Sequence, residues 1–157
     1  MRMVYKVLAF AVAGLVVVQA AAVAFGVFGQ LAWIDGGGTL DASTAESDVT
    51  FAGVAGFMIH GMFGTIVIPV VALLLLISSF FAHTPGAVKW GLIVFVTTAV
   101  QIALGIFAHS APQLGILHGA VALVLFGVAV MAGMLAKKPV TTGESTTAQP
   151  TAPVATV

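Results

Sequence analysis

The feature that most constrains this chain is a series of four long apolar segments that carry almost no charge. These segments occupy about residues 4–29, 51–82, 88–108 and 114–136. A helix that crosses the hydrocarbon core of a bilayer needs about 20 apolar residues, so each segment is long enough to span the membrane. Backbone groups in lipid must find hydrogen-bond partners within their own structure. The pattern therefore predicts an all-α integral membrane protein built as a four-helix bundle.

The amino-acid composition also indicates a lipid environment and excludes other classes of protein. Hydrophobic residues make up 61% of the 157 residues and charged residues only 6%, whereas a soluble domain has about 25% charged residues. A nucleic-acid-binding protein needs a basic face, which five Lys and Arg residues do not supply. Because cysteine is absent, disulfides, thiolate metal sites and iron–sulfur clusters are excluded.

Polar segments divide the chain into one membrane domain and a tail. Residues 30–50 form an acidic, glycine-rich connection, and residues 83–87 and 109–113 form two short turns. Residues 137–157 are rich in Thr, Pro, Ala and Val. We therefore expect residues 1–136 to be the four-helix transmembrane domain and residues 137–157 to be a disordered cytoplasmic tail.

Basic residues indicate the orientation, since they concentrate in cytoplasmic loops. In a four-span topology all five fall on one side: Arg2, Lys6, Lys89, Lys137 and Lys138. Both termini are thus expected in the cytoplasm, with the chain a multi-pass protein of the bacterial plasma membrane. The first segment also has the basic start of a signal peptide, but its apolar run of about 26 residues exceeds the roughly 7–15 of a signal peptide. We expect an uncleaved helix.

The ionisable side chains inside the spans are histidines, and an ionisable group in the membrane is a candidate functional residue. At about 1.5 Å per residue, His60 and His118 lie about 9 and 10 Å outside the midpoints of their helices. They share one depth, on two helices that run in the same direction. His109 is expected at the outer interface and His83 at the inner interface.

A glutamine accompanies each deep histidine. The first hairpin carries Gln19 and then His60 followed by glycine; the second carries Gln101 and then His118 followed by glycine. Because both hairpins run in, out and in again, we predict two pseudo-repeated hairpins related by an axis along the membrane normal. The two histidines would then face each other across the bundle core.

Two facing imidazoles in a helix bundle are typical of a haem with two histidine ligands. We predict that His60 and His118 bind the iron of a haem b in the outer half of the bilayer. Glycines at three- and four-residue spacing on the second span, including Gly53 and Gly56, would leave room for the macrocycle. The other residues expected to bind the cofactor are Gly64, Gln19, Gln101 and His109.

Each of these residues also has a simpler structural interpretation. A single His or Gln in a span can form an interhelical hydrogen bond, and glycines allow close helix packing without a cofactor. A zinc or copper site would need more ligands, since no thiolate or carboxylate lies at that depth. The equal depth of the two histidines favours the haem interpretation.

Short motifs in the four spans carry a family resemblance: Val18-Gln19, His60-Gly61-Met62-Phe63-Gly64, Val100-Gln101 and Leu117-His118-Gly119. Over about residues 4–136, the chain resembles an uncharacterised family of small four-helix bacterial membrane proteins, commonest in actinobacteria, and is similar to one half of haem A synthase. Each half of haem A synthase places a histidine on its second and fourth helices, and His60 and His118 are the matching positions. Haem binding is what the resemblance implies.

This chain also departs from haem A synthase. It has one four-helix half, no outer-loop cysteines and no membrane-embedded glutamate. These departures argue against haem modification. The predicted function is therefore electron transfer or haem handling by a small cytochrome b-like protein, with quinol or a respiratory complex as partner, and the residues favour an electron-transfer component over an enzyme. The alternatives are a cofactor-free accessory subunit of a larger complex and, with less support, a transporter.

Overall fold

The structure, a computed structural model, describes residues 1–41 and 50–136, and this part of the chain is all-helical. Its elements are α1 (Arg2–Asp35), α2 (Val54–Met62), the π-helix η2 (Phe63–Val67), α3 (Ile68–Ser79), α4 (Ala87–Ala108) and α5 (Leu114–Leu135). Since α2, η2 and α3 are continuous, the described residues contain four helices long and apolar enough to cross a membrane. The predicted all-α, four-span fold is confirmed.

The boundaries of the helices differ from those predicted in two places. The first helix continues to Asp35 and ends where three consecutive glycines begin at Gly36, because glycine is a poor helix former. The second helix is shorter than the predicted segment 51–82, since Gly53 starts it with a φ of 100°, a conformation that other residues rarely adopt. The predicted disordered tail lies outside the described residues.

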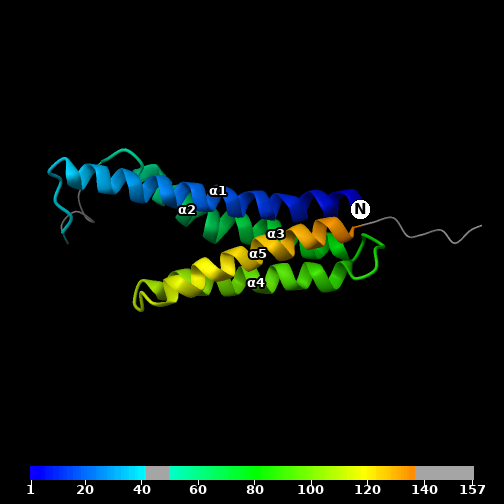
Figure 1. Cartoon of the computed structure of the whole chain (residues 1–157). Coiled ribbons are helices and arrows are strands. Elements are labelled where there is room, and N and C mark those ends of the chain that lie inside the picture. The colour runs from blue at the N-terminus through cyan, green and yellow to red at the C-terminus, as the bar shows by residue number, and fades with distance from the viewer. Residues whose placement is uncertain (42–49, 137–157) are drawn as a thin grey trace, which may run out of the picture.

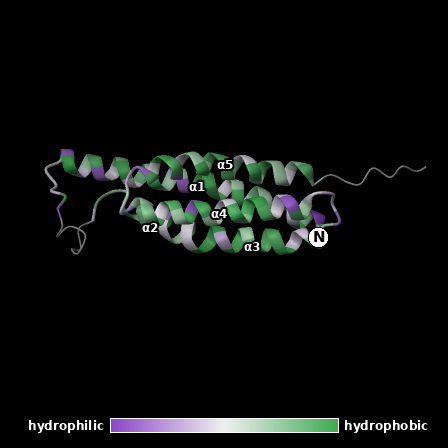
Figure 2. Ribbon diagram, turned by 90° about the horizontal axis from the view of Figure 1, so that it is seen from below, coloured by the Kyte–Doolittle hydropathy of each residue, from purple (hydrophilic) through white to green (hydrophobic). Residues whose placement is uncertain are grey.

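The four spans form an up-and-down bundle (Figure 1). The N-terminus, the connection between α3 and α4, and the end of α5 lie at one end of the bundle; we call this the terminal end. The end of α1, the start of α2 and the turn between α4 and α5 lie at the opposite end (Figure 1). Apolar residues cover the shafts of the helices, with polar residues concentrated toward the ends (Figure 2). The basic residues Arg2, Lys6 and Lys89 belong to the terminal end, which the charge pattern predicts to be cytoplasmic.

Much of the apolar surface faces outward, as expected for helices surrounded by lipid. Met58, Ile116 and Leu123 are 70%, 76% and 75% exposed, respectively. In water a surface of this kind would be a liability. In a bilayer it needs no protein partner, because lipid tails solvate it.

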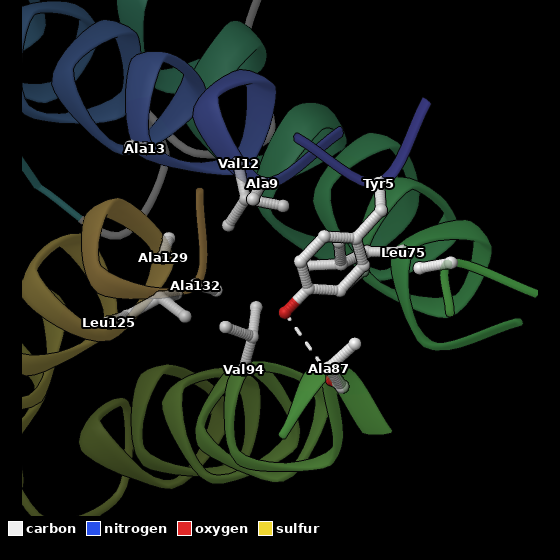
Figure 3. Close-up of a cluster of buried hydrophobic side chains, with 12 residues drawn as sticks. Tyr5, Ala9, Val12, Ala13, Leu75, Ala87, Val94, Leu125, Ala129 and Ala132 are labelled. Atoms are coloured by element: carbon white, nitrogen blue, oxygen red, sulfur yellow. Dashed lines mark hydrogen bonds between the residues drawn. The ribbon is translucent and has the colours of Figure 1, made fainter. Parts of the chain in front are cut away.

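A packed core fills the terminal half of the bundle (Figure 3). Small and branched side chains from α1, α3, α4 and α5 are almost completely buried there: Ala9, Val12, Ala72, Leu75, Val94, Leu125, Ala129 and Ala132. The hydroxyl of Tyr5 donates a hydrogen bond to the carbonyl of Ala87 at 3.3 Å and ties the start of α1 to the start of α4. This half of the bundle is therefore closed.

Glycines hold the second span against α1 near the opposite end. The residues concerned are Gly26, Gly29, Gly53 and Gly56, and a Cβ on any of them would collide with the other segment. Gly53 and Gly56 thus serve close helix packing, the simpler interpretation, and do not leave room for a macrocycle. The consequence is that α2 lies along α1, and the pair α2 and α5 is not among the closely packed helix pairs of the described structure.

Candidate functional site

A cavity of about 520 Å³ occupies the half of the bundle beyond the packed core. All four spans contribute to its wall, which is mainly apolar. The six residues predicted to bind the cofactor line this one cavity: Gln19, His60, Gly64, Gln101, His109 and His118. Its size falls within the range of about 300–1,000 Å³ that is usual for cofactor and small-molecule sites.

The two deep histidines meet in this cavity. His60 comes from α2 and His118 from α5, and their ring centroids are 6.1 Å apart with the ring planes at 65°. These residues are 58 positions apart in the sequence, so only the packing of the helices brings them together. The prediction that they share a depth is consistent with this contact.

Both imidazoles are anchored through Nδ1 to a backbone carbonyl of the preceding helix. His60 Nδ1 lies 3.2 Å from the carbonyl oxygen of Gln19, and His118 Nδ1 lies 3.0 Å from that of Gln101. A carbonyl can only accept, so each of these bonds forms in the tautomer with the proton on Nδ1, which leaves the Nε2 lone pair free. Histidines that bind metals are usually oriented by this kind of hydrogen bond.

The two hairpins therefore share one contact, in which the histidine of the second helix bonds to the glutamine of the first. The sequence predicted the pairing of Gln19 with His60 and of Gln101 with His118. It did not predict that the partner atom is the main-chain oxygen, because any residue type at positions 19 and 101 would supply one. The glutamine side chains are free for other roles.

Those glutamine side chains differ between the two hairpins. The Gln19 carboxamide donates from Nε2 to the carbonyl of His60 and accepts at Oε1 from the N–H of Gly64, both at 3.0 Å. We assign this amide orientation because it gives each polar atom a partner of the opposite kind. Gln101 Oε1 is buried and has no hydrogen-bond partner among the described residues.

Nε2 of the Gln19 carboxamide also lies 2.8 Å from His60 Nδ1. Nδ1 of His60 therefore either donates to the Gln19 carbonyl when it is protonated or accepts from the carboxamide when it is bare, and the two bonds exclude each other. Only the first tautomer leaves Nε2 available as a metal ligand. His118 Nδ1 bonds to a carbonyl alone, which selects that tautomer.

Glycines in the cavity wall have a different role from those between α1 and α2. A Cβ built on Gly61, Gly115 or Gly119 meets nothing within 4 Å, so these glycines border empty space and do not pack against a helix. A Cβ on Gly105 would lie 3.0 Å from Cε1 of His118. Gly105 therefore makes room for the imidazole itself.

Two further histidines lie at the ends of the bundle. His109 lines the cavity and is exposed, with Nδ1 bonded to the carbonyl of Gly105 at 3.1 Å within its own helix. His83 lies in the connection at the terminal end, where Nδ1 bonds to the carbonyl of Phe81 at 2.9 Å. His83 does not line the cavity, in agreement with its prediction as an interface residue.

Sequence reasoning did not single out two threonines of the cavity wall, Thr65 and Thr98. Their hydroxyls donate within their own helices, to the carbonyls of Gly61 at 2.7 Å and Val94 at 2.9 Å. Threonine in a membrane helix commonly bonds in this way, so no sequence signal separates these residues from ordinary ones.

The donor set limits which metal centre the cavity can hold. In residues 1–41 and 50–136, no cluster of three or more His, Cys, Asp or Glu could bind an ion. Zinc sites generally use three or four protein ligands. Two imidazoles are sufficient where the metal brings its other ligands with it, as iron does in haem.

Comparison of the chain with protein-family models, curated proteins and solved structures finds no match. The resemblance to a four-helix family and to half of haem A synthase therefore stays a prediction, and the geometry of the cavity is the evidence that bears on function.

Proposed function

We propose that this chain is a small membrane haem protein in which His60 and His118 bind one haem b. The observation that supports it most is the pair of imidazoles, each anchored at Nδ1 and 6.1 Å apart across the cavity. The proposed location is the outer half of the bacterial plasma membrane.

The separation of the rings suits a shared metal. Bonds between a metal and an imidazole nitrogen are about 2 Å long, so two imidazoles that shared one metal would have ring centroids about 6 Å apart. The observed 6.1 Å agrees with this distance.

The shape and polarity of the cavity also suit a flat, mainly apolar group. Gly61 lies on one side of the cavity and Gly115 and Gly119 on another, with open space beside each. His109, at the exposed end of α4, is the polar side chain best placed to meet a carboxylate at the edge of the group. Among the described residues no Lys or Arg lines this cavity, so charge neutralisation by a basic residue is not part of the proposal.

A haem held here would supply one-electron redox chemistry, and two axial histidines leave no free position on the metal. This favours electron transfer or haem handling over an oxygen-activating enzyme. We propose quinol or a respiratory complex as partner, because both would approach from the bilayer or its outer surface.

The packed terminal half of the bundle does not support the transporter alternative. A through-path would have to cross the layer formed by Val12, Leu75, Val94 and Leu125, which are at most 2% exposed. The cofactor-free accessory subunit explains the hydrogen bonds of His60 and His118 equally well. It gives no reason for free Nε2 atoms beside a cavity bordered by unpacked glycines.

Absorption spectroscopy on the purified protein tests the proposal. From cells supplied with a haem precursor, the protein should show a reduced-minus-oxidised difference spectrum of a low-spin b-type haem. His60→Ala and His118→Ala should each abolish or strongly change this spectrum. His83→Ala is the matched control, since His83 lies outside the cavity, and should leave it unchanged. Absence of haem, or a spectrum that survives both cavity substitutions, would refute the proposal and favour the cofactor-free subunit.

A further inference from the structure

The Gln19 side chain makes an unusual connection to the backbone of the second span. Its carboxamide bonds to the carbonyl of His60 and to the N–H of Gly64, both at 3.0 Å. These two backbone groups are four residues apart, and in an α-helix they would bond to each other. Gln19 is 8% exposed, so its carboxamide has little access to other partners.

The second span leaves the α-helical register at this point. The π-helix η2, Phe63–Val67, begins directly after α2, and Ile68 donates to the carbonyl of Phe63, five residues back. A π-turn holds one more residue than an α-turn and needs an external cause. Insertion of a side chain into the helical ladder is one such cause, and Pro69, which lacks an N–H, is a second.

The equivalent position of the other hairpin lacks this feature. Gln101 Oε1 has no partner in the described structure, and α5 is a regular α-helix from Leu114 to Leu135. Both glutamines supply a main-chain carbonyl to a histidine, but only Gln19 also bonds to the helix that carries the histidine. At the level of the two glutamines, the hairpins therefore differ in the bonds of the Gln19 side chain and in the π-turn.

We propose that Gln19 is a positioning residue that holds the second span in the π register and thereby sets the direction in which His60 points. Without the carboxamide, the N–H of Gly64 loses its acceptor. The carbonyl of His60, which also accepts from the N–H of Phe63, is the acceptor four residues back that an α-helix would use. The extra residue of the π-turn must then be absorbed by rotation of α2. One residue corresponds to a rotation of about 100°, which moves a Cα atom by about 3.5 Å and turns His60 away from His118.

Distance measurements between spin labels test the position of α2 without any cofactor. The chain has no native cysteine, and Met58 and Ile116 each precede a cavity histidine by two residues and are strongly exposed. With labels at Met58→Cys and Ile116→Cys, Gln19→Leu should shift the distance distribution by about 3 Å or more. Gln30→Leu, the same change in the same helix at a residue that does not line the cavity, should leave the distribution unchanged.

A deletion provides the decisive second variant. Removing Ile66, which is 59% exposed and does not line the cavity, takes the extra residue out of the π-turn. The span can then form a regular α-helix without the carboxamide and without rotation. In the Gln19→Leu background, this deletion should restore the wild-type distance distribution. If Gln19→Leu alone does not fold, the variant that also lacks Ile66 should still fold and give the wild-type distance distribution.

A second readout depends on the proposed haem. Gln19→Leu should lower haem affinity by about 10- to 100-fold, the usual effect of losing a group that orients a metal ligand, and should reduce the low-spin signal in the EPR spectrum. Deletion of Ile66 should restore both.

The two proposals fail separately. If the protein binds no haem, the label distances still report on Gln19. If it binds haem, unchanged distances in Gln19→Leu, or a shifted distribution that the Ile66 deletion does not restore, would overturn the role of Gln19 alone.

Discussion

Gly105→Ala places a single methyl group against the proposed axial ligand His118. Gly105 lies in α4, opposite the imidazole, and the new Cβ would be 3.0 Å from Cε1 and 3.2 Å from Nδ1 of that ring. Carbon atoms normally pack at about 3.5–4.0 Å. The imidazole must therefore retreat by several tenths of an ångström, which lengthens its 3.0 Å hydrogen bond to the Gln101 carbonyl.

Two opposing terms determine the effect on stability. Replacing glycine by alanine inside a helix is worth about 1 kcal/mol, whereas an added methyl group in a filled site costs about 1–3 kcal/mol. The apoprotein should thus be destabilised by about 0–2 kcal/mol. Haem binding should suffer more, by about 10- to 100-fold in affinity, because the displaced ring loses its orienting bond.

Gly127→Ala is the matched control for this substitution. Gly127 lies in α5, away from the cavity, and a Cβ there meets nothing within 4 Å. It should stabilise the apoprotein by about 1 kcal/mol and leave haem affinity unchanged. The assays are unfolding in mixed detergent micelles and haem titration of the apoprotein. If Gly105→Ala bound haem as tightly as Gly127→Ala, the placement of His118 as an axial ligand would be refuted.

Three further predictions concern the surrounding structure. Gly61→Ala should stabilise the apoprotein by about 0.5–1 kcal/mol, because its Cβ meets open space, but it should weaken haem binding. A variant that is more stable and also binds haem at least as tightly as the wild type would contradict a ligand beside Gly61. Gly29→Val should separate α1 from the start of the second span, since its Cβ collides with the carbonyl of Ala52, and should appear as lost crosslinking between cysteines placed in the two segments. Tyr5→Phe should cost about 0.5–1.5 kcal/mol through loss of the bond to the Ala87 carbonyl. An unfolding midpoint that matches the wild type would show that this bond contributes nothing.

Local features of the sequence were sufficient for the fold class and for six residues that line the cavity. Span length and charge depend on neighbouring residues only, so the four spans could be predicted, together with the common depth of His60 and His118. Helical spacing in turn placed Gln19, Gln101 and Gly64 near that depth, and all of these residues line one cavity.

The roles of the glycines could not be read in the same way. Gly53 and Gly61 are both glycines of the second span, yet one packs against α1 and the other borders open space. The sequence grouped Gly53 and Gly56 with Gly64 because all three recur at helical spacing. Which face of a helix meets a neighbour depends on the positions of the other helices, and no local pattern records them.

The sequence by itself determined the solvent of this protein, the number of its spans and the level at which its polar groups meet. Only the tertiary structure decided which atoms bond to one another. Main-chain oxygens anchor both histidines, and the Gln19 side chain bridges His60 and Gly64, whereas Gln101 Oε1 has no partner among the described residues. The physical reason is the distance over which each property acts. Hydropathy and helix rise depend on residues that are close together in the sequence, whereas a hydrogen bond between spans depends on helix packing to within a few tenths of an ångström.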